Sequence, residues 1–100
     1  MRLGTIIKQP EEFKDYTIDY SPWLTPVEDT IDDVRFEVEC LTDPDDDSLK
    51  IVGDTEYTEM ALKFWVEGGT AGYRYKVSVL VSTVIGRIDE SEVIFKIKDY

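Results

Sequence analysis

The stretch Trp65-Val-Glu-Gly-Gly-Thr-Ala-Gly-Tyr-Arg-Tyr-Lys-Val-Ser-Val79 decides the fold, together with Ile85-Gly86-Arg87-Ile88, which follows it. Its pattern predicts a strand, a glycine-rich turn, a long strand, a tight turn and a third strand. Along the long strand Tyr75, Val77, Val79 and Val81 fall on one face, and Arg74, Lys76 and Ser78 fall on the other. One apolar face with a period of two is typical of a sheet that is buried on one side.

The same alternation recurs on both sides of this stretch and predicts about seven short strands joined by turns. We expect strands over residues 16–20, 31–40, 49–52, 60–66, 73–83 and 88–97, with Gly53-Asp54 ending the third. Residues 21–26 contain two prolines, which bar them from a central strand and predict a turn or an edge segment. Trp23 and Leu24 in that segment are expected to fold back and plug one end of the core.

The number and spacing of the strands predict an all-β fold, an immunoglobulin-like antiparallel β-sandwich. In such sandwiches a tyrosine near the start of a long strand bonds its hydroxyl back to the preceding corner. Tyr75 and Tyr73 both follow the glycine-rich turn, and either suits that role; both are equally compatible with ordinary strand aromatics. We expect a single sandwich domain over residues 13–100, preceded by an extended N-terminal arm at residues 1–12.

The composition favours a folded domain and argues against nucleic-acid-binding and membrane-spanning proteins. Of the 100 residues 42% are hydrophobic, which favours a folded domain, and the formal net charge is −11. The 11 basic residues are scattered, so we expect no nucleic-acid partner, and there is no apolar run of the length that a membrane helix needs. The N-terminus lacks the apolar core of a signal peptide. The lone Cys40 precludes an internal disulfide and suits synthesis in a cytoplasm.

Enzyme chemistry finds little support in the sequence. Histidine is absent, and Cys40 lies on the apolar face of a strand, where a free cysteine is usually a core residue. Gly68, Gly69 and Gly72 precede a strand without the Lys-Ser/Thr pair of a phosphate loop, so a turn is the better interpretation. No pair of carboxylates stands out as an acid and a base. We therefore expect no catalysis and no cofactor.

The acidic segment from Asp43 to Asp47 is the most metal-like cluster. Asp43, Asp45 and Asp47 alternate like the first ligands of a calcium-binding loop, but Ser48 stands where that loop needs glycine, and Asp54 stands where it needs glutamate. A solvated acidic loop is the simpler interpretation. A weak calcium site at the loop stays open as an alternative.

Several motifs together resemble a family of small tailed-phage structural proteins described as fiber-tail adaptors. The matching motifs are Lys8-x-Pro10, the stretch from Tyr16 to Leu24, Asp29-Thr30-Ile31, the stretch from Trp65 to Val77, and Thr83-x-x-Gly86-Arg87-x-x-Glu90. The resemblance implies a non-enzymatic virion protein at the tail, the fiber attachment point or the head–tail neck. It also implies partners among other virion proteins, and such parts often occur in multiple copies or as a homo-oligomeric ring.

We expect five apolar residues to contact these partners: Ile6, Ile7, Phe13, Trp23 and Trp65. A capsid decoration protein and a host-surface glycan-binding module are the alternatives. For the glycan-binding module, Trp65 with Tyr73 nearby would form the exposed aromatic surface. The net charge indicates that a protein partner is basic where it touches this chain.

Overall fold

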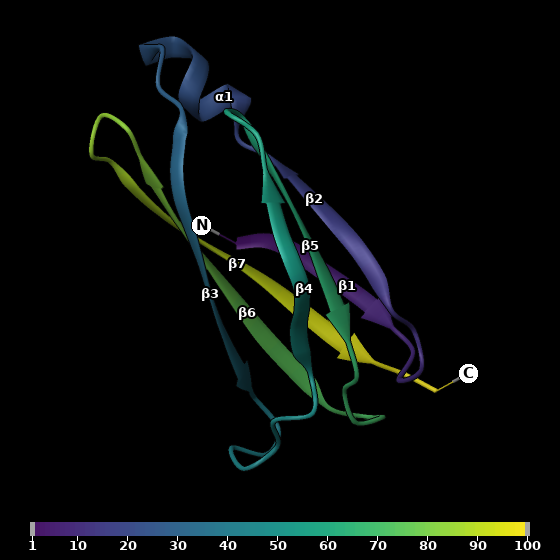
Figure 1. Ribbon diagram of the computed structural model, residues 1–100. Helices are drawn as coiled ribbons and strands as arrows, with labels where there is room; N and C mark the ends of the chain where they lie inside the picture. Colours follow the sequence, from purple (N-terminus) through teal and green to yellow (C-terminus); the bar gives the residue numbers. More distant parts are fainter. Residues whose placement is uncertain (1, 100) are drawn as a thin grey trace.

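A computed structural model describes residues 2–99, apart from the side chains of Arg2 and residues 53–56. The regular secondary structure of the described chain is almost entirely β (Figure 1). Its strands are β1 (Arg2–Lys8), β2 (Lys14–Asp19), β3 (Ile31–Cys40), β4 (Lys50–Tyr57), β5 (Ala61–Glu67), β6 (Arg74–Thr83) and β7 (Ile88–Ile97). Between β2 and β3 lie two helical turns, α1 (Ser21–Leu24) and η1 (Thr25–Val27). No helix within residues 2–99 is long and apolar enough to cross a bilayer.

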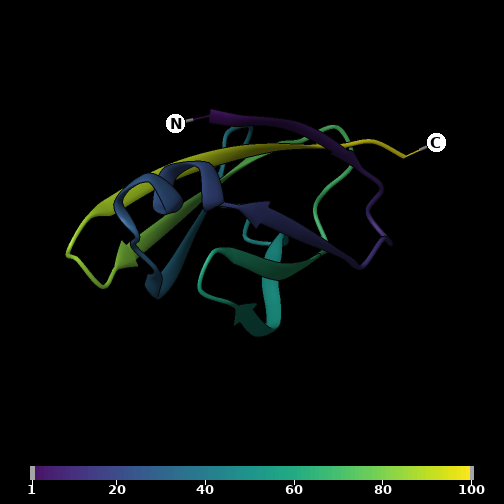
Figure 2. The ribbon, with the colours of Figure 1, turned by 90° about the horizontal axis from the view of Figure 1, so that it is seen from above.

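The strands form two sheets that face each other as two layers, which are seen from above in Figure 2. One sheet has the order β1-β7-β6-β3, and the other has the order β2-β5-β4. Neighbouring strands are antiparallel except β1, which runs parallel to β7. In immunoglobulin-like sandwiches the third, sixth and seventh strands share one sheet, and the second, fifth and fourth strands share the other. The strands of this chain are distributed in the same way. The predicted fold class is therefore confirmed.

The N-terminal residues belong to the sandwich. Residues 2–8, expected to form an extended arm, pair with β7 as strand β1. The end of β1 is tied to the opposite layer by Lys8, whose buried ammonium donates to the carbonyl of Gly68 over 2.7 Å and to that of Gln9 over 2.9 Å. Burial lowers the pKa of Lys8, and the negative charges of Glu12 and Glu67 partly oppose this shift.

The core lies between the sheets and contains the residues that the alternation assigned to it. Val77, Val79 and Val81 of β6 are fully buried. Cys40 is also buried, as expected of a core cysteine. The proline-containing segment, predicted to be a turn or an edge segment, forms the two helical turns α1 and η1. Its Leu24, which is 0% exposed, plugs the core as predicted. β4 runs on to Tyr57 and does not end at Gly53-Asp54, since the strand continues past an irregularity in its pairing with β5.

The corner before β6 depends on Tyr75. Its side chain is fully buried, and its hydroxyl accepts a hydrogen bond from the Thr70 amide over 2.9 Å. The same hydroxyl donates to a carboxylate oxygen of Asp46 over 2.9 Å. This is the predicted tyrosine corner, and Tyr75 makes it. The turn also needs glycine at Gly68, which has φ +80° and whose Cβ would collide with the Ser48 carbonyl.

Candidate protein-binding face

The outer face of the β2-β5-β4 sheet follows directly from the alternation of β5. Leu62, Phe64 and Val66 are buried in the core, so Lys63 and Trp65 project to the other side. Because opposite residues in a pleated sheet share a face, the register with β2 puts Asp15 beside Trp65. The register with β4 puts Val52 on the other side of Trp65.

Phe13 completes an aromatic surface on this face. It lies immediately before β2 and stacks on Trp65, with ring centroids 5.1 Å apart and an interplanar angle of 26°. Phe13 is 54% exposed, although large aromatic side chains usually bury most of their surface. Both residues are among the five predicted contact residues, and the structure brings them together. We call the pair the Phe13–Trp65 platform.

Charged side chains flank the platform. The Lys63 ammonium lies 5.2 Å from the centroid of the Trp65 ring, within the range of a cation–π contact. Lys63 also pairs with Asp15, with a nitrogen–oxygen distance of 3.4 Å. An aromatic centre with a polar margin is the composition of protein-binding hot spots. Lys63 and Asp15 are not among the predicted contact residues, because only the pairing of β2 with β5 shows that they lie beside Trp65.

The other predicted contact residues lie apart from the platform. Ile6 is half-buried and packs against the core. Ile7, its neighbour on β1, is 53% exposed on the outer face of the opposite sheet. Tyr73 also packs against the core, so the ring that accompanies Trp65 is Phe13 and not Tyr73.

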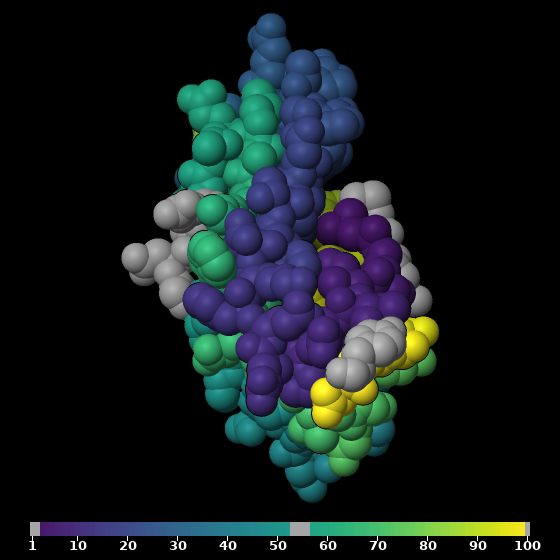
Figure 3. Space-filling view, turned by 90° about the vertical axis from the view of Figure 1, so that its right-hand side faces the viewer, coloured from purple at the N-terminus to yellow at the C-terminus, as the bar shows by residue number. Residues whose placement is uncertain are grey.

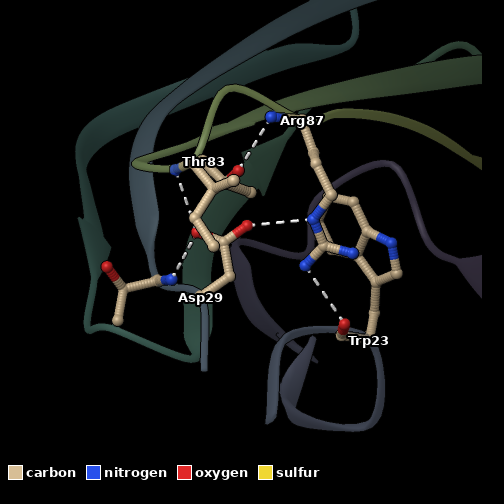
Figure 4. Close-up of polar contacts among 6 residues, drawn as sticks. Trp23, Asp29, Thr83 and Arg87 are labelled. Atoms are coloured by element: carbon tan, nitrogen blue, oxygen red, sulfur yellow. Dashed lines mark hydrogen bonds and ion pairs between the residues drawn. The ribbon is translucent and has the colours of Figure 1, made fainter. Parts of the chain in front are cut away.

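Trp23 is held in place by a partly buried polar cluster at the end of the sandwich near α1 (Figure 4). The Arg87 guanidinium lies 4.2 Å from the centroid of the Trp23 ring and donates to the Trp23 carbonyl over 3.2 Å. Arg87 also donates to Asp29 over 3.0 Å, and the Asp29 side chain is fully buried. Trp23 therefore contributes to the packing of this end of the fold, whatever else it touches.

The pKa of Asp29 reflects how this carboxylate is held. Burial alone would raise the pKa, but hydrogen bonds from Thr83, the Ile85 amide, Arg87 and the Thr30 amide outweigh burial. Together they hold the pKa of Asp29 at about 2, below its usual 3.8. The carboxylate is thus charged at neutral pH and braces the turn between β6 and β7.

In the acidic loop, Asp46 is engaged within the protein. Its carboxylate accepts hydrogen bonds from Ser48, from the Thr70 hydroxyl over 2.6 Å and from Tyr75. The hydrogen bonds from Ser48 and then Thr70 hold the pKa of Asp46 well below its usual range. Asp43 accepts from the Asp45 amide, which is a local turn contact. No group of three or more acidic or thiol side chains among the described residues is arranged to hold a metal ion.

The platform is thus suited to binding by surface contact. It offers exposed aromatic area, one cation and one carboxylate on a sheet that is anchored to the core. The side chains that carry strongly shifted pKa values, Asp29 and Asp46, serve the fold at other places.

The sequence profile of the family described as podophage GP4 fiber-tail adaptor protein gp77 matches residues 8–96. This range includes Phe13, Trp65 and all strands from β2 to β6, as well as most of β7. Among curated proteins no relative matches the chain.

Proposed function

Since the chain belongs to the podophage fiber-tail adaptor family, we propose that it joins other tail components of a phage particle through the Phe13–Trp65 platform. The observation that carries this proposal is the exposed Phe13 ring stacked on the half-buried Trp65 ring, on the outer face of the β2-β5-β4 sheet. An adaptor acts by contact and needs no reacting groups, which agrees with an arrangement suited to binding.

The partner surface is expected to be apolar at its centre and basic at its margin. The net charge of −11 produces a field that attracts basic surfaces and speeds their association. Truncation of a hot-spot aromatic residue typically costs at least about 2 kcal/mol of binding free energy, or about 30-fold in affinity.

The test is complementation of a parent phage that lacks this gene. Particles made with the wild-type chain, with Trp65→Ala or with Phe13→Ala would be counted by electron microscopy for attached fibers and assayed for infectivity. Both variants are expected to lower the number of fiber-bearing particles. Val84→Ala is the matched control, because Val84 is 67% exposed in the β6–β7 turn, away from the platform. Normal fiber attachment with both platform variants would refute the proposed binding face.

Immunogold labelling of intact virions would locate the chain. We expect labelling at the tail, the neck or the fiber base, whereas uniform labelling of the head would favour a capsid decoration protein. A glycan-binding role would predict a signal on a glycan array that disappears with Trp65→Ala while fiber attachment is retained. Image reconstruction of the same particles would give the number of copies in each particle and show whether they form a ring.

A further inference from the structure

A groove of about 410 Å³ opens between β1 and β2, where the two sheets diverge. Residues 3–6 of β1 and 16–19 of β2 form its walls, and Phe64 and Val93 lie at its base. Figure 3 looks at this side of the molecule, with β1 in purple, β2 in blue and yellow atoms of the C-terminal part of the chain visible between them. The core is therefore reached directly through this groove.

Both strands that border the groove are at the edges of their sheets. No described strand pairs with the second edge of β1 or with the second edge of β2. In sandwiches of the immunoglobulin constant type the first strand lies beside the second, in the same sheet. Here β1 pairs with β7, so the place beside β2 is open.

Among the four edge strands, β2 has the most regular pairing. The pairing of β1 shifts next to Gly4, that of β3 shifts between residues 31 and 33, and that of β4 shifts between residues 52 and 56. Such irregularities bend an edge and protect it from pairing with other chains. The six residues of β2 pair with β5 without a shift, so β2 presents a straight edge.

The side chains of β2 specify what could lie beside it. Tyr16 and Ile18 point toward the core and are half-buried at the groove, so a neighbouring strand would place apolar side chains next to them. Asp15 and Asp19 point outward and are exposed. Opposite charges facing each other on neighbouring strands stabilise the pair, so the outward residues of that strand would be basic.

We propose that β2 accepts an extended segment of another virion protein as an added strand, with apolar residues in the groove and lysine or arginine opposite Asp15 and Asp19. Main-chain hydrogen bonds to the edge would provide affinity, and the groove and the two carboxylates would provide specificity. Asp15 lies between this edge and the Phe13–Trp65 platform, whereas the groove, Asp19 and the backbone edge of β2 are not part of the platform. The edge of β2 therefore gives the chain a second surface with which to join two proteins.

The test uses the full chain and a ten-residue peptide that alternates isoleucine or valine with lysine. A peptide with glutamate in place of lysine is the comparison. The lysine peptide is expected to bind at least about tenfold more tightly, and its affinity should fall as salt is added. Hydrogen–deuterium exchange should slow in residues 14–19 when it binds. Failure of the lysine peptide to bind, or slowed exchange at β3 or β4 instead, would overturn the proposal.

Charge reversal at Asp15 and Asp19 tests whether these two carboxylates bind the lysine peptide. The double variant Asp15→Lys/Asp19→Lys is expected to bind the lysine peptide about tenfold more weakly, because two attractions become repulsions. Asp32→Lys/Asp33→Lys, on the exposed edge of β3, changes the net charge equally and should bind within about twofold of the wild type. Trp65→Ala should also bind normally, which separates this site from the platform. Equal weakening by both double variants would mean that only net charge matters and would refute the site.

Discussion

Replacement of Trp23 by alanine separates a packing role from a contact role for this residue. The half-buried indole removes on the order of 100 Å² of apolar surface from water, which contributes about 2.5 kcal/mol. Its contact with Arg87, at 4.2 Å, adds about 0.5–1 kcal/mol, and its edge contact with the Tyr20 ring, at 6.3 Å, adds a similar amount. Trp23→Ala should therefore lower the free energy of unfolding by about 3.5–4.5 kcal/mol.

For a domain of this size such a loss lowers Tm by at least about 14 °C. A typical domain is stable by about 5–15 kcal/mol, so the variant should still fold at room temperature. The measurement is thermal unfolding followed by circular dichroism. Val27→Ala is the control, because Val27 is 49% exposed in the neighbouring helical turn and should change the stability by less than about 0.5 kcal/mol. A Tm for Trp23→Ala within about 3 °C of the wild type, together with failed fiber attachment, would show that Trp23 is a partner contact and that the packing argument is wrong.

Three further predictions follow from the polar contacts. Tyr75→Phe should lower the free energy of unfolding by about 1–2 kcal/mol, because the Thr70 amide loses its acceptor. Urea unfolding at pH 7 measures this loss. An unchanged midpoint would contradict the role of Tyr75 in the corner. Because the pKa of Asp29 is held at about 2, the stability that its ionised form contributes is complete above about pH 4 and is lost as the pH falls toward 2. Asp29→Asn should therefore have a lower Tm than the wild type at pH 6, and its Tm should decrease less steeply than that of the wild type below pH 4. Parallel profiles of Tm against pH for the variant and the wild type would contradict this prediction. Calcium or a chelator should leave the Tm unchanged, because Asp46 already accepts hydrogen bonds from Ser48, Thr70 and Tyr75; a rise in Tm with calcium would restore the metal-site alternative.

Local alternation predicted most of the strands because each strand has one buried face. β3 and β7 have the predicted boundaries, and the apolar residues of β6 are in the core. β1 was predicted as an arm because its pairing partner, β7, is distant along the chain, and only β7 makes the short N-terminal segment a strand. β4 was predicted too short because glycine and aspartate usually end strands, whereas the strand continues past Gly53 and Asp54 and its pairing with β5 resumes at Glu56.

The sequence by itself determined the β-sandwich and the buried Cys40, because these depend on the period of two. For the corner it left Tyr73 and Tyr75 as candidates, and the hydrogen bonds of the Tyr75 hydroxyl decided between them. The sequence also indicated Phe13 and Trp65 as contact residues, each considered separately. Only the tertiary structure decided that the two rings stack, that Lys63 and Asp15 flank them, and that a groove opens beside the regular edge of β2. Those features depend on the register between strands and on the separation of the two sheets, which arise when segments far apart along the chain pack together.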